Sequence, residues 1–425
     1  MNAANAKTAL NAAISPLVNY SYSKQLQFKW EHAFDVFDRL AFRLRQVCGH
    51  GSFRCKVDKT LSSPLTVAYR NKDEFSIWPS ISGERKTVGF CVGRPSRGER
   101  VVCVEPDDEL IITKNSHKKL AKLFQTYLRT LSPLDICTDL TDGGNWRRFI
   151  VRSNRKGEHM LITVMHPQKL KTNDIDDEKQ RLKTYFNSLA EENSILSLFF
   201  QACPGVRCTH ETAPFQLLFG QKTLKETLNG ITFEISPETF FQVNTDAAEV
   251  LYKVVIDELK LSPNHIVIDL CCGIGALSLQ IAPYVQRVIG IDRSKSAIED
   301  AKRNAELNHI KNCVFIDGLV ENVFHRLYDD LSNRRIVVIA NPSRDGLTTS
   351  VIKAIRDLPF IERVVYISCK PEGNASQNFF HLVLPERIRR DIRGIPFYLD
   401  NAIPVDLFPH TPHYELVVTF ERFES

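Results

Sequence analysis

Three polar side chains stand where apolar, strand-like runs begin or end in the last hundred residues. "RVVYISCKPEG" ends a run with Cys369, "ANPSRDG" ends one with Asn341, and "FPHTPHYELVVTF" leads into one through Glu415. In an open α/β sheet such strand ends converge on one crevice. A thiol, an amide and a carboxylate would then meet there, although a lone cysteine after a strand is more often a small buried hydrophobe.

Combined with a methyl donor held at the glycine-rich turn of residues 267–279, this set of groups fits addition chemistry on a pyrimidine ring. The C5 carbon of uracil is too weak a nucleophile to attack a methyl sulfonium, but a thiolate added to C6 turns the ring into an enolate. A base must then remove the C5 proton before the thiolate can leave. The sequence therefore predicts Cys369 as nucleophile and Glu415 as base. The Asn341 amide suits the N3–H and O4 edge of uracil.

A glycine-rich turn predicts a cofactor site nearby. "VIDLCCGIGALSL" places Gly273 and Gly275 between a strand and a helix, where glycine lets the backbone approach a ligand closely. Ser278 stands where the dinucleotide fingerprint has its third glycine, so the turn does not match the NAD fingerprint. Asp292 closes the next strand, where a carboxylate accepts both ribose hydroxyls of an adenosine-type cofactor. The alternative is an ordinary strand–helix turn with a surface Asp.

Regular alternation of strands and helices after about residue 230 predicts the elements that position these groups. Strands are expected at 265–270, 287–292, 334–342 and 363–368, with helices between them, one capped by Ser294. Such alternation implies a doubly wound parallel sheet of the α/β class. We therefore expect a Rossmann-like domain over residues 231–425.

The earlier part of the chain mixes helices and strands in an α+β manner. Helices are expected at 21–47 and 117–131 and strands at 147–153 and 159–167, whereas "SILSLFF" fits a buried helix or a strand. We expect a leader at residues 1–15, disordered or helical, and an α+β RNA-binding region over residues 16–230.

Charge divides the 425 residues unevenly. Residues 1–230 hold 34 Lys and Arg against 24 Asp and Glu, and residues 231–425 hold 21 against 26. A basic first half predicts electrostatic binding of RNA. Arg70 and Lys72 of "YRNKDEF" are candidates for phosphate contacts, with a charged turn as the alternative. Four more candidates cannot be ranked from sequence: Arg147, Arg148, Arg152 and Arg155.

Cysteine usage and apolar runs exclude several classes. The 11 cysteines lack the paired spacing of a zinc or iron–sulfur site, so no metal is expected, and mostly free thiols in a reducing compartment are predicted. No run reaches the roughly 18–20 apolar residues that cross a bilayer, so no membrane partner is expected. The first thirty residues have no Asp or Glu but also no Arg, which leaves mitochondrial or cytoplasmic location open with a lean to mitochondrial. Oligomeric state stays open.

Together the motifs resemble the RNA (uracil-5-)-methyltransferase family, particularly the animal tRNA enzymes and their mitochondrial branch. The resemblance runs from about Pro16 onward through "YRNKDEF", "PFQLLFG", "FEISPETFFQVNTDAAEVLY", "LCCGIG", "NPSRDGL", "SCKP" and "PHTPHYE". It implies S-adenosyl-L-methionine as cofactor. It also implies a substrate, the conserved uridine of the T-loop in the tRNA T-arm, with ribosomal RNA as a second RNA to consider.

The resemblance also implies roles for single residues. Cys369 and Glu415 fall on the family's nucleophile and base. The implied cofactor-binding residues are Gln242, Cys271, Gly273, Gly275, Ala276, Asp292 and Asn341. The expected contacts to the RNA substrate come from Arg70, Lys72, Gln242, Asn341 and Arg344.

Two positions depart from the family pattern. Its D-P-P-R reads N-P-S-R here, from Asn341 to Arg344, and its S-C-N-P reads S-C-K-P, with Lys370. An amide in place of the carboxylate keeps a hydrogen-bond acceptor but removes a charge near the sulfonium. We expect activity to survive the change.

Two other functions are alternatives to uracil-C5 methylation. A cytosine-C5 RNA methyltransferase typically pairs two cysteines, in T-C and P-C motifs, whereas "SCKP" stands alone here. A folding factor that binds RNA without methylating it is suggested by the departures at Asn341 and Lys370.

Overall fold

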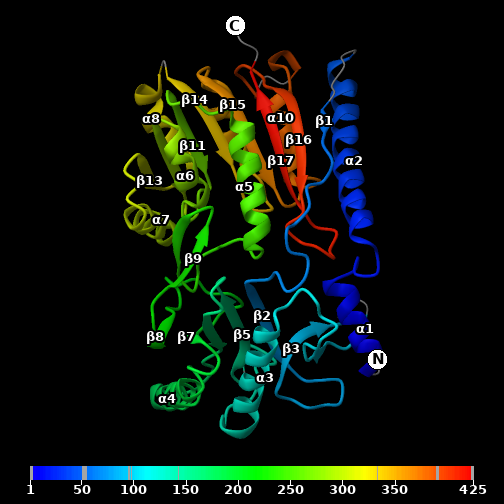
Figure 1. Cartoon of the computed structure of the whole chain (residues 1–425), viewed down its shortest axis with the longest axis vertical. Coiled ribbons are helices and arrows are strands. Elements are labelled where there is room, and N and C mark those ends of the chain that lie inside the picture. The colour runs from blue at the N-terminus through cyan, green and yellow to red at the C-terminus, as the bar shows by residue number, and fades with distance from the viewer. Residues whose placement is uncertain are drawn as a thin grey trace. The chain divides into compact units, whose positions relative to one another are not determined.

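The computed structural model, drawn in Figure 1, describes residues 3–49, 55–93, 96, 98–141, 143–332, 334–388 and 392–422. Two compact units make up the chain. Unit 1 comprises Met1–Asn19, Leu65–Glu226 and Glu234–Thr245. Unit 2 comprises Tyr20–Pro64, Thr227–Phe233 and Asp246–Ser425. Each unit has its own sheet, and the strands β9 (Leu224–Leu228) and β10 (Ile231–Ile235) pair separately.

Unit 1 is built on a seven-stranded sheet in the order β4-β3-β2-β5-β6-β7-β8. Its strands are β2 (Lys72–Trp78), β3 (Thr87–Val92), β4 (Val102–Val104), β5 (Trp146–Ser153), β6 (His159–Met165), β7 (Ile195–Ala202) and β8 (Gln216–Gly220). Its helices are α1 (Ala3–Ile14), α3 (Asn115–Thr130) and α4 (Thr172–Ser188). Neighbouring strands are antiparallel except β6 and β7, which are joined by α4 because parallel strands need a crossover.

An aromatic core fills unit 1 between the sheet and its helices. Phe124 of α3 stacks on Phe149 of β5 with ring centroids 4.4 Å apart, and Trp146 meets Phe124 edge-on. "SILSLFF" falls in β7, and its alternate residues Leu198 and Phe200 enter this core. The run looks uniformly apolar because β7 is an inner strand buried on both faces.

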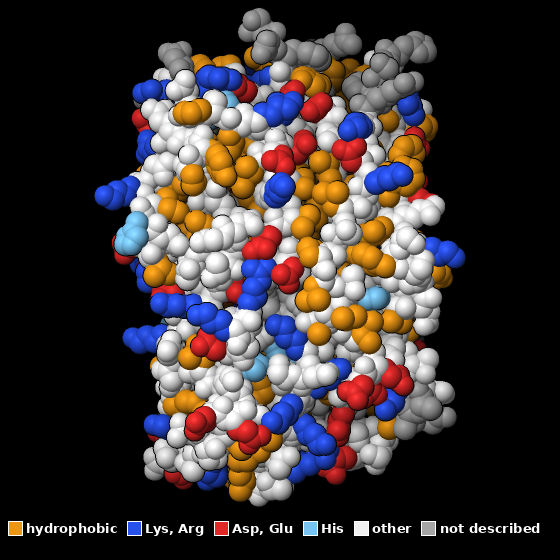
Figure 2. Space-filling view, in the orientation of Figure 1, with side chains coloured by type: hydrophobic (Ala, Val, Ile, Leu, Met, Phe, Trp, Pro, Cys, Tyr) orange, Lys and Arg blue, Asp and Glu red, His pale blue; other side chains and the backbone are white. Residues whose placement is uncertain are grey.

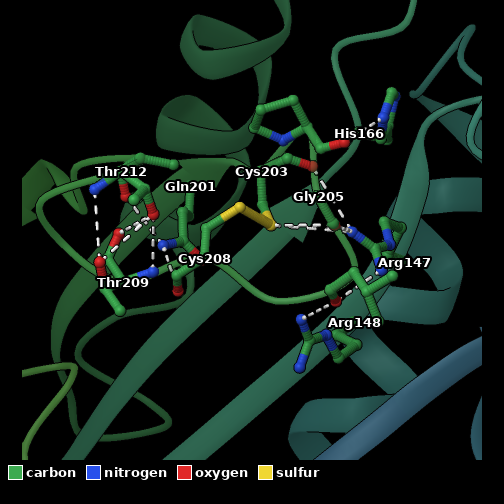
Figure 3. Close-up of a disulfide and its surroundings, with 12 residues drawn as sticks. Arg147, Arg148, His166, Gln201, Cys203, Gly205, Cys208, Thr209 and Thr212 are labelled. Atoms are coloured by element: carbon green, nitrogen blue, oxygen red, sulfur yellow. Dashed lines mark hydrogen bonds between the residues drawn. A yellow bond between two sulfur atoms is a disulfide. The ribbon is translucent and has the colours of Figure 1, made fainter.

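A disulfide joins Cys203 and Cys208 in the segment after β7 (Figure 3). The Arg147 guanidinium donates to the carbonyl oxygens of Gly205 and Val206 inside the same loop. The other nine cysteines, all within the described ranges, form no disulfide. This pair therefore departs from the expected free thiols, because two residues five positions apart meet only when the intervening chain folds back.

Unit 2 is built on an eight-stranded sheet in the order β1-β16-β17-β15-β14-β11-β12-β13. Its strands are β1 (Lys56–Val57), β11 (His265–Leu270), β12 (Arg287–Asp292), β13 (Cys313–Asp317), β14 (Arg335–Ala340), β15 (Ile361–Ser368), β16 (Tyr398–Val405) and β17 (Glu415–Glu421). All pairs are parallel except those of β17, which runs antiparallel to both β15 and β16.

Helices cover both faces of the unit 2 sheet. They are α2 (Tyr22–Cys48), α5 (Thr245–Leu259), α6 (Ala276–Ile281), α7 (Lys295–Leu307), α8 (Val320–Leu331), α9 (Thr349–Asp357) and α10 (Asn374–Val383). Short 3-10 helices follow at Ala282–Tyr284 and Glu386–Ile388. One core cluster joins a sheet face to α2, α8, α9 and α10, and Figure 1 shows α5 in front of the sheet. The predicted α/β class is confirmed in this unit.

The two units are not the two continuous segments expected from the sequence. Tyr20–Pro64 was placed in the first region, but it belongs to unit 2. Its helix α2 buries Ala33, Phe37, Leu40 and Leu44 in the sheet's core cluster, and Figure 1 shows α2 beside β1 and β16. Spacing of i, i+4, i+7 and i+11 shows that a helix has an apolar face but not which sheet that face meets. The leader prediction covered α1, which is helical and packs on β3 and β4.

Arg356 of α9 is fully buried, and its guanidinium joins α9 to the end of α10 and to the chain that follows α10. Its guanidinium donates to the carbonyl oxygens of His381 at 2.7 Å, Leu384 at 2.6 Å and Gly394 at 2.7 Å. These bonds fasten the end of α10 and the chain after it to α9, because each buried carbonyl needs a donor.

Replacing Arg356 with methionine should therefore lower the free energy of unfolding by about 2–4 kcal/mol, since buried carbonyls lose charged hydrogen bonds. Chemical denaturation followed by circular dichroism measures this. Lys302→Met, at an exposed lysine of α7, is the matched control and should change stability by no more than about 0.5 kcal/mol. A loss as small as the control's would show that Arg356 is not a structural anchor.

Candidate functional site

The candidate site lies at the edge of the unit 2 sheet where the parallel strands end. β11 is the strand at which the order reverses, since β12 pairs with one side of it and β14 with the other. Ligands of open α/β sheets bind at such a switch point, beyond the carboxyl ends of the strands. The segments that follow β11, β14 and β15 therefore share this edge.

The turn after β11 adopts a backbone that few residues tolerate. Cys271, Gly273 and Gly275 have φ of 62°, 56° and 77°, in the left-handed region. A Cβ added at Gly275 would lie 2.9 Å from the ring of Phe315, so a side chain cannot be accommodated there. At Gly273 no described atom lies within 4 Å of the added Cβ, which leaves room for a ligand against the turn.

Asp292 at the end of β12 is fixed beside that turn. Its Oδ2 accepts the Gly273 N–H at 3.0 Å, and its Oδ1 accepts the Ser294 N–H at 2.8 Å. From the other side, the Asn341 N–H donates to the Leu270 carbonyl at 3.2 Å, which places Asn341 next to the end of β11. An oriented carboxylate beside open backbone fits the ribose of an adenosine-type cofactor.

Strand register brings Cys369 and Glu415 to the same place. Ser368, the last residue of β15, pairs with Leu416 of β17, and the two strands are antiparallel. One step further along this register, Cys369 lies opposite Glu415, and directly opposed residues have Cβ atoms about 4.5–5.5 Å apart. The structure thus unites a thiol and a carboxylate separated by 45 intervening residues.

Alternation along the strands decides which face these groups occupy. Tyr366, Leu416 and Val418 enter the core cluster shared with α10. Residues an odd number of positions away, Cys369 and Glu415 among them, therefore point to the opposite face of the sheet, where Arg363 and Thr419 bind Glu258 of α5.

Burial controls the acid–base behaviour of the pair. Burial raises the pKa of Glu415 to about 8, with the positive charge of Arg344 opposing the rise. Burial and then the negative charge of Glu415 raise the pKa of the Cys369 thiol, which Arg344 lowers through its hydrogen bond and charge. A protonated Glu415 removes one obstacle to thiolate formation, so the two groups favour opposite charge states.

Asp269 and Tyr252 belong to the site but were not predicted. Burial raises the pKa of Asp269 to about 7, its Oδ2 accepts the Ser278 hydroxyl at 2.6 Å, and its Oδ1 has no hydrogen-bond partner among the described residues. Burial, then the charges of Asp269 and Glu415, raise the pKa of Tyr252 on α5. A carboxylate inside the apolar run "HIVIDL" was the available signal for Asp269, whereas nothing in the sequence marks Tyr252.

Three of the predicted ligand-binding residues lie in unit 1. Gln242 is buried, and its carbonyl accepts the Asn71 side-chain N–H at 2.8 Å. Arg70 binds the Asp73 carboxylate at 2.7 Å and donates to the Lys72 carbonyl. Burial lowers the pKa of Lys72 to about 8, helped by nearby arginines. Their predicted contacts with cofactor and RNA stay predictions.

Three of the four unranked arginines differ in what their side chains already bind, whereas for Arg155 the backbone N–H donates to the Glu226 carboxylate at 3.1 Å. Arg152 is buried and donates to the Thr239 carbonyl. Arg148 pairs with Glu74 at 2.7 Å. Arg147 holds the disulfide loop, as described above. These side chains already bind groups within the protein. The bonds do not indicate a contact with RNA.

Surface charge is mixed on the face drawn in Figure 2. Lys and Arg side chains alternate there with Asp and Glu, and hydrophobic side chains lie among them. Within the described ranges, no cluster of three or more His, Cys, Asp or Glu could hold a metal ion. No described helix has the length and apolar character to cross a membrane.

Comparison with known proteins places the chain in a family. The family model "tRNA (Uracil-5-)-methyltransferase" matches residues 206–423. A zebrafish (Danio rerio) tRNA (uracil-5-)-methyltransferase homolog B is 40% identical over 97% of this chain and 86% of its own. The chain belongs to the tRNA (uracil-5-)-methyltransferase family.

Other members and one solved structure agree with this. The human (Homo sapiens) homolog B is 36% identical over 96% of this chain and 83% of its own. The human homolog A is 35% identical over 98% and 68%. The Pyrococcus abyssi tRNA (uracil-54, C5)-methyltransferase, solved with S-adenosyl-L-homocysteine, is 21% identical, with a TM-score of 0.65 over 95% of this chain and 84% of its own. That likeness shows the fold.

Membership of the tRNA (uracil-5-)-methyltransferase family confirms the predicted resemblance and the predicted enzyme class. The methyl donor of that class is S-adenosylmethionine, as predicted. The Rossmann-like methyltransferase fold is confirmed by the archaeal structure. The roles given to individual site residues stay predictions.

The raised pKa of Glu415 has a consequence for stability. Because the folded protein holds this proton up to about pH 8 while an ordinary carboxyl releases it near 4.5, folding takes up a proton in this window. Stability should fall as pH rises from 4.5 to 8. Glu415→Gln removes the effect, so the variant should gain stability over the natural protein with rising pH, by on the order of a few kcal/mol at pH 8.5.

Denaturant titrations at pH 5 and pH 8.5 measure the change. Glu306→Gln, at an exposed carboxylate of α7, is the control and should show no pH-dependent gain. An equal difference between Glu415→Gln and the natural protein at both pH values would contradict the buried, protonated carboxyl.

Proposed function

We propose that this protein methylates C5 of the conserved T-loop uridine in tRNA, using S-adenosyl-L-methionine and a covalent Cys369 adduct. The observation that carries the proposal is the register of β15 and β17, which, extended by one residue, brings Cys369 opposite Glu415, whose charge acts on the thiol. Family membership supports the reaction, since the related proteins are named for uracil-5 methylation of tRNA.

The residues at the switch point fit the cofactor. Asp292 offers its carboxylate to the ribose, the turn from Cys271 through Gly273 leaves room beside the backbone, and Asn341 adjoins it. Ala276 and Gly275 begin α6 directly after the turn. When bound, S-adenosylmethionine supplies an electrophilic methyl group for C5.

Cys369 and Glu415 divide the remaining chemistry between them. The Cys369 thiolate adds to C6 of the uracil, forming a carbon–sulfur bond and moving an electron pair toward C5 and O4. Once C5 carries the methyl group, Glu415 in its carboxylate form, having released its own proton, accepts the C5 proton. The electron pair of that C–H bond reforms the C5–C6 double bond, and the thiolate leaves.

The target uridine must be presented to this site outside its stack. Attack on C6 and methylation of C5 need access to the faces of the ring, so the base is flipped from the folded RNA into a pocket. We assign contacts with it to Asn341, Arg344 and Gln242. The basic residues Arg70 and Lys72 are assigned to phosphates of the T-arm.

A transfer assay tests the reaction and the nucleophile. Purified protein, an unmodified tRNA transcript and labelled S-adenosylmethionine should give labelled 5-methyluridine at one T-loop position. Cys369→Ala should reduce transfer at least about 10³-fold, because C5 of the free ring is not nucleophilic enough. Cys313→Ala, at a half-buried free thiol of β13, is the control and should keep transfer near the natural rate.

The other functions are outcomes of the same assay. Labelled 5-methylcytidine would replace the proposal with cytosine methylation, and RNA binding without any transfer would favour a folding factor. Mapping 5-methyluridine in mitochondrial and cytosolic RNA of cells with and without the protein locates its substrates. Loss from ribosomal RNA alone would overturn the T-loop assignment.

The base is tested by the fate of the adduct. Glu415→Gln should slow proton removal by about 10²-fold or more and so accumulate an RNA–protein adduct that migrates slowly on denaturing gels. The double variant Cys369→Ala/Glu415→Gln is the control and should form no adduct. Undiminished methyl transfer by Glu415→Gln with no adduct would show that another group takes the proton.

A further inference from the structure

One face of α2 carries four polar side chains that all reach the segment before Glu415. They are Tyr22, Gln25, Lys29 and His32, at spacings of three, four and three residues, which keeps them on one side of the helix. Each of them has a partner between the end of β16 and the start of β17, in residues 406–414. Nearly four hundred residues of chain separate the two segments.

The strongest of these contacts is a buried ion pair. Lys29 Nζ lies 2.5 Å from Asp406 Oδ1, and both side chains are 0% exposed. Lys29 also donates to the Phe408 carbonyl at 3.1 Å, and Tyr22 donates its hydroxyl proton to Asp406 Oδ2 at 3.0 Å. Every charge in the pair is thus hydrogen-bonded, which is the condition under which a buried pair fixes a geometry.

Gln25 holds the middle of the segment. Its Oε1 accepts the His410 N–H at 2.8 Å, and its Nε2 lies 3.1 Å from His410 Nδ1. His410 has φ of 68°, a left-handed conformation that is unfavourable for a residue with a side chain. Such a backbone conformation persists only where the surroundings impose it. Gln25 does so by binding both the backbone N–H and the imidazole of His410.

His32 holds the last residue before the carboxylate. Its Nδ1 lies 2.8 Å from the hydroxyl oxygen of Tyr414, and the two rings meet edge-on at 5.8 Å between centroids. Tyr414 precedes Glu415 directly in the chain. Burial, and then the positive charges of Arg344 and Lys29, lower the pKa of His413, which lies within residues 406–414.

We propose that this face of α2 positions Glu415 for removal of the C5 proton. This inference rests on the proposed function. Lys29 and Gln25 touch neither the uracil nor the cofactor in it, so they are positioning residues that act through the backbone of residues 406–414. α2 thereby controls the release of the methylated RNA from the enzyme.

Cys369 does not depend on the same support. It follows β15, which is held by hydrogen bonds to β14 on one side and β17 on the other. Loosening residues 406–414 should therefore leave addition of the thiolate nearly unchanged and slow proton removal. A merely structural role of α2 would slow both steps together.

Two RNA substrates separate these steps. On RNA carrying 5-fluorouridine at the target, no C5 proton exists, so adduct formation is complete without Glu415. On ordinary uridine RNA, turnover requires it. Gln25→Ala is expected to slow turnover about 10- to 100-fold, the size of effect a misplaced group produces, with adduct formation on the fluorinated RNA within about twofold of natural.

Lys29→Met/Asp406→Asn is the second variant, since removing the pair leaves no unpaired buried charge to prevent folding. It should behave like Gln25→Ala. Gln27→Ala, at an exposed residue of α2, is the control and should change neither step. All variants are compared at equal folded concentration by circular dichroism.

The outcomes distinguish the two proposals. If the natural protein gives neither adduct nor methyl transfer, the proposed function fails. If the natural protein performs both and the α2 variants slow the two steps equally, or slow neither, the function stands and the positioning role of α2 is wrong.

Discussion

The antiparallel course of β17 is the constraint on which the site depends. In a wholly parallel sheet only the carboxyl ends of strands reach the ligand edge. Because β17 runs the other way between β15 and β16, its first residue, Glu415, arrives at the edge where Cys369 leaves β15. A parallel β17 would carry that carboxylate to the far edge, about 20 Å away for a seven-residue strand.

Burial gives the pair its chemical character. A carboxyl group enclosed by protein resists ionisation, and an enclosed thiol does the same, so two anions side by side are disfavoured at neutral pH. Arg344 adds a positive charge that both groups sense. The arrangement suits a reaction in which one group is anionic at the start and the other must be anionic later.

Much of the unit 2 architecture could be predicted because its strands and helices differ in period and its turns carry glycine. The glycine turn and Asp292 could be placed together because they follow consecutive strands, β11 and β12, which also pair in the sheet. The opposition of Cys369 and Glu415 was predicted as convergence only, because register and strand direction are set by long-range pairing. Tyr252 could not be predicted, because its proximity to Asp269 and Glu415 depends on where α5 packs.

Other differences have the same origin. The apolar face of α2 was evident, but its partners lie hundreds of residues away, so the segment was placed in the wrong unit. The Cys203–Cys208 disulfide depends on a fold-back of the loop between them. The local spacing of apolar residues shows which face of a helix or strand is buried. Which part of the chain that face packs against is set by residues far away in the sequence.

The division of unit 2 along the polypeptide has a consequence for how the protein is made. α2 leaves the ribosome before most of the strands it covers, which follow only after roughly 180 residues, nearly all of unit 1, and this takes on the order of ten seconds or more at ordinary rates of synthesis. Throughout that interval Phe37, Leu40 and Leu44 have no sheet to cover. The nascent chain therefore exposes an apolar helix face to which chaperones can bind, and unit 2 can complete its sheet only once β17 has been synthesised.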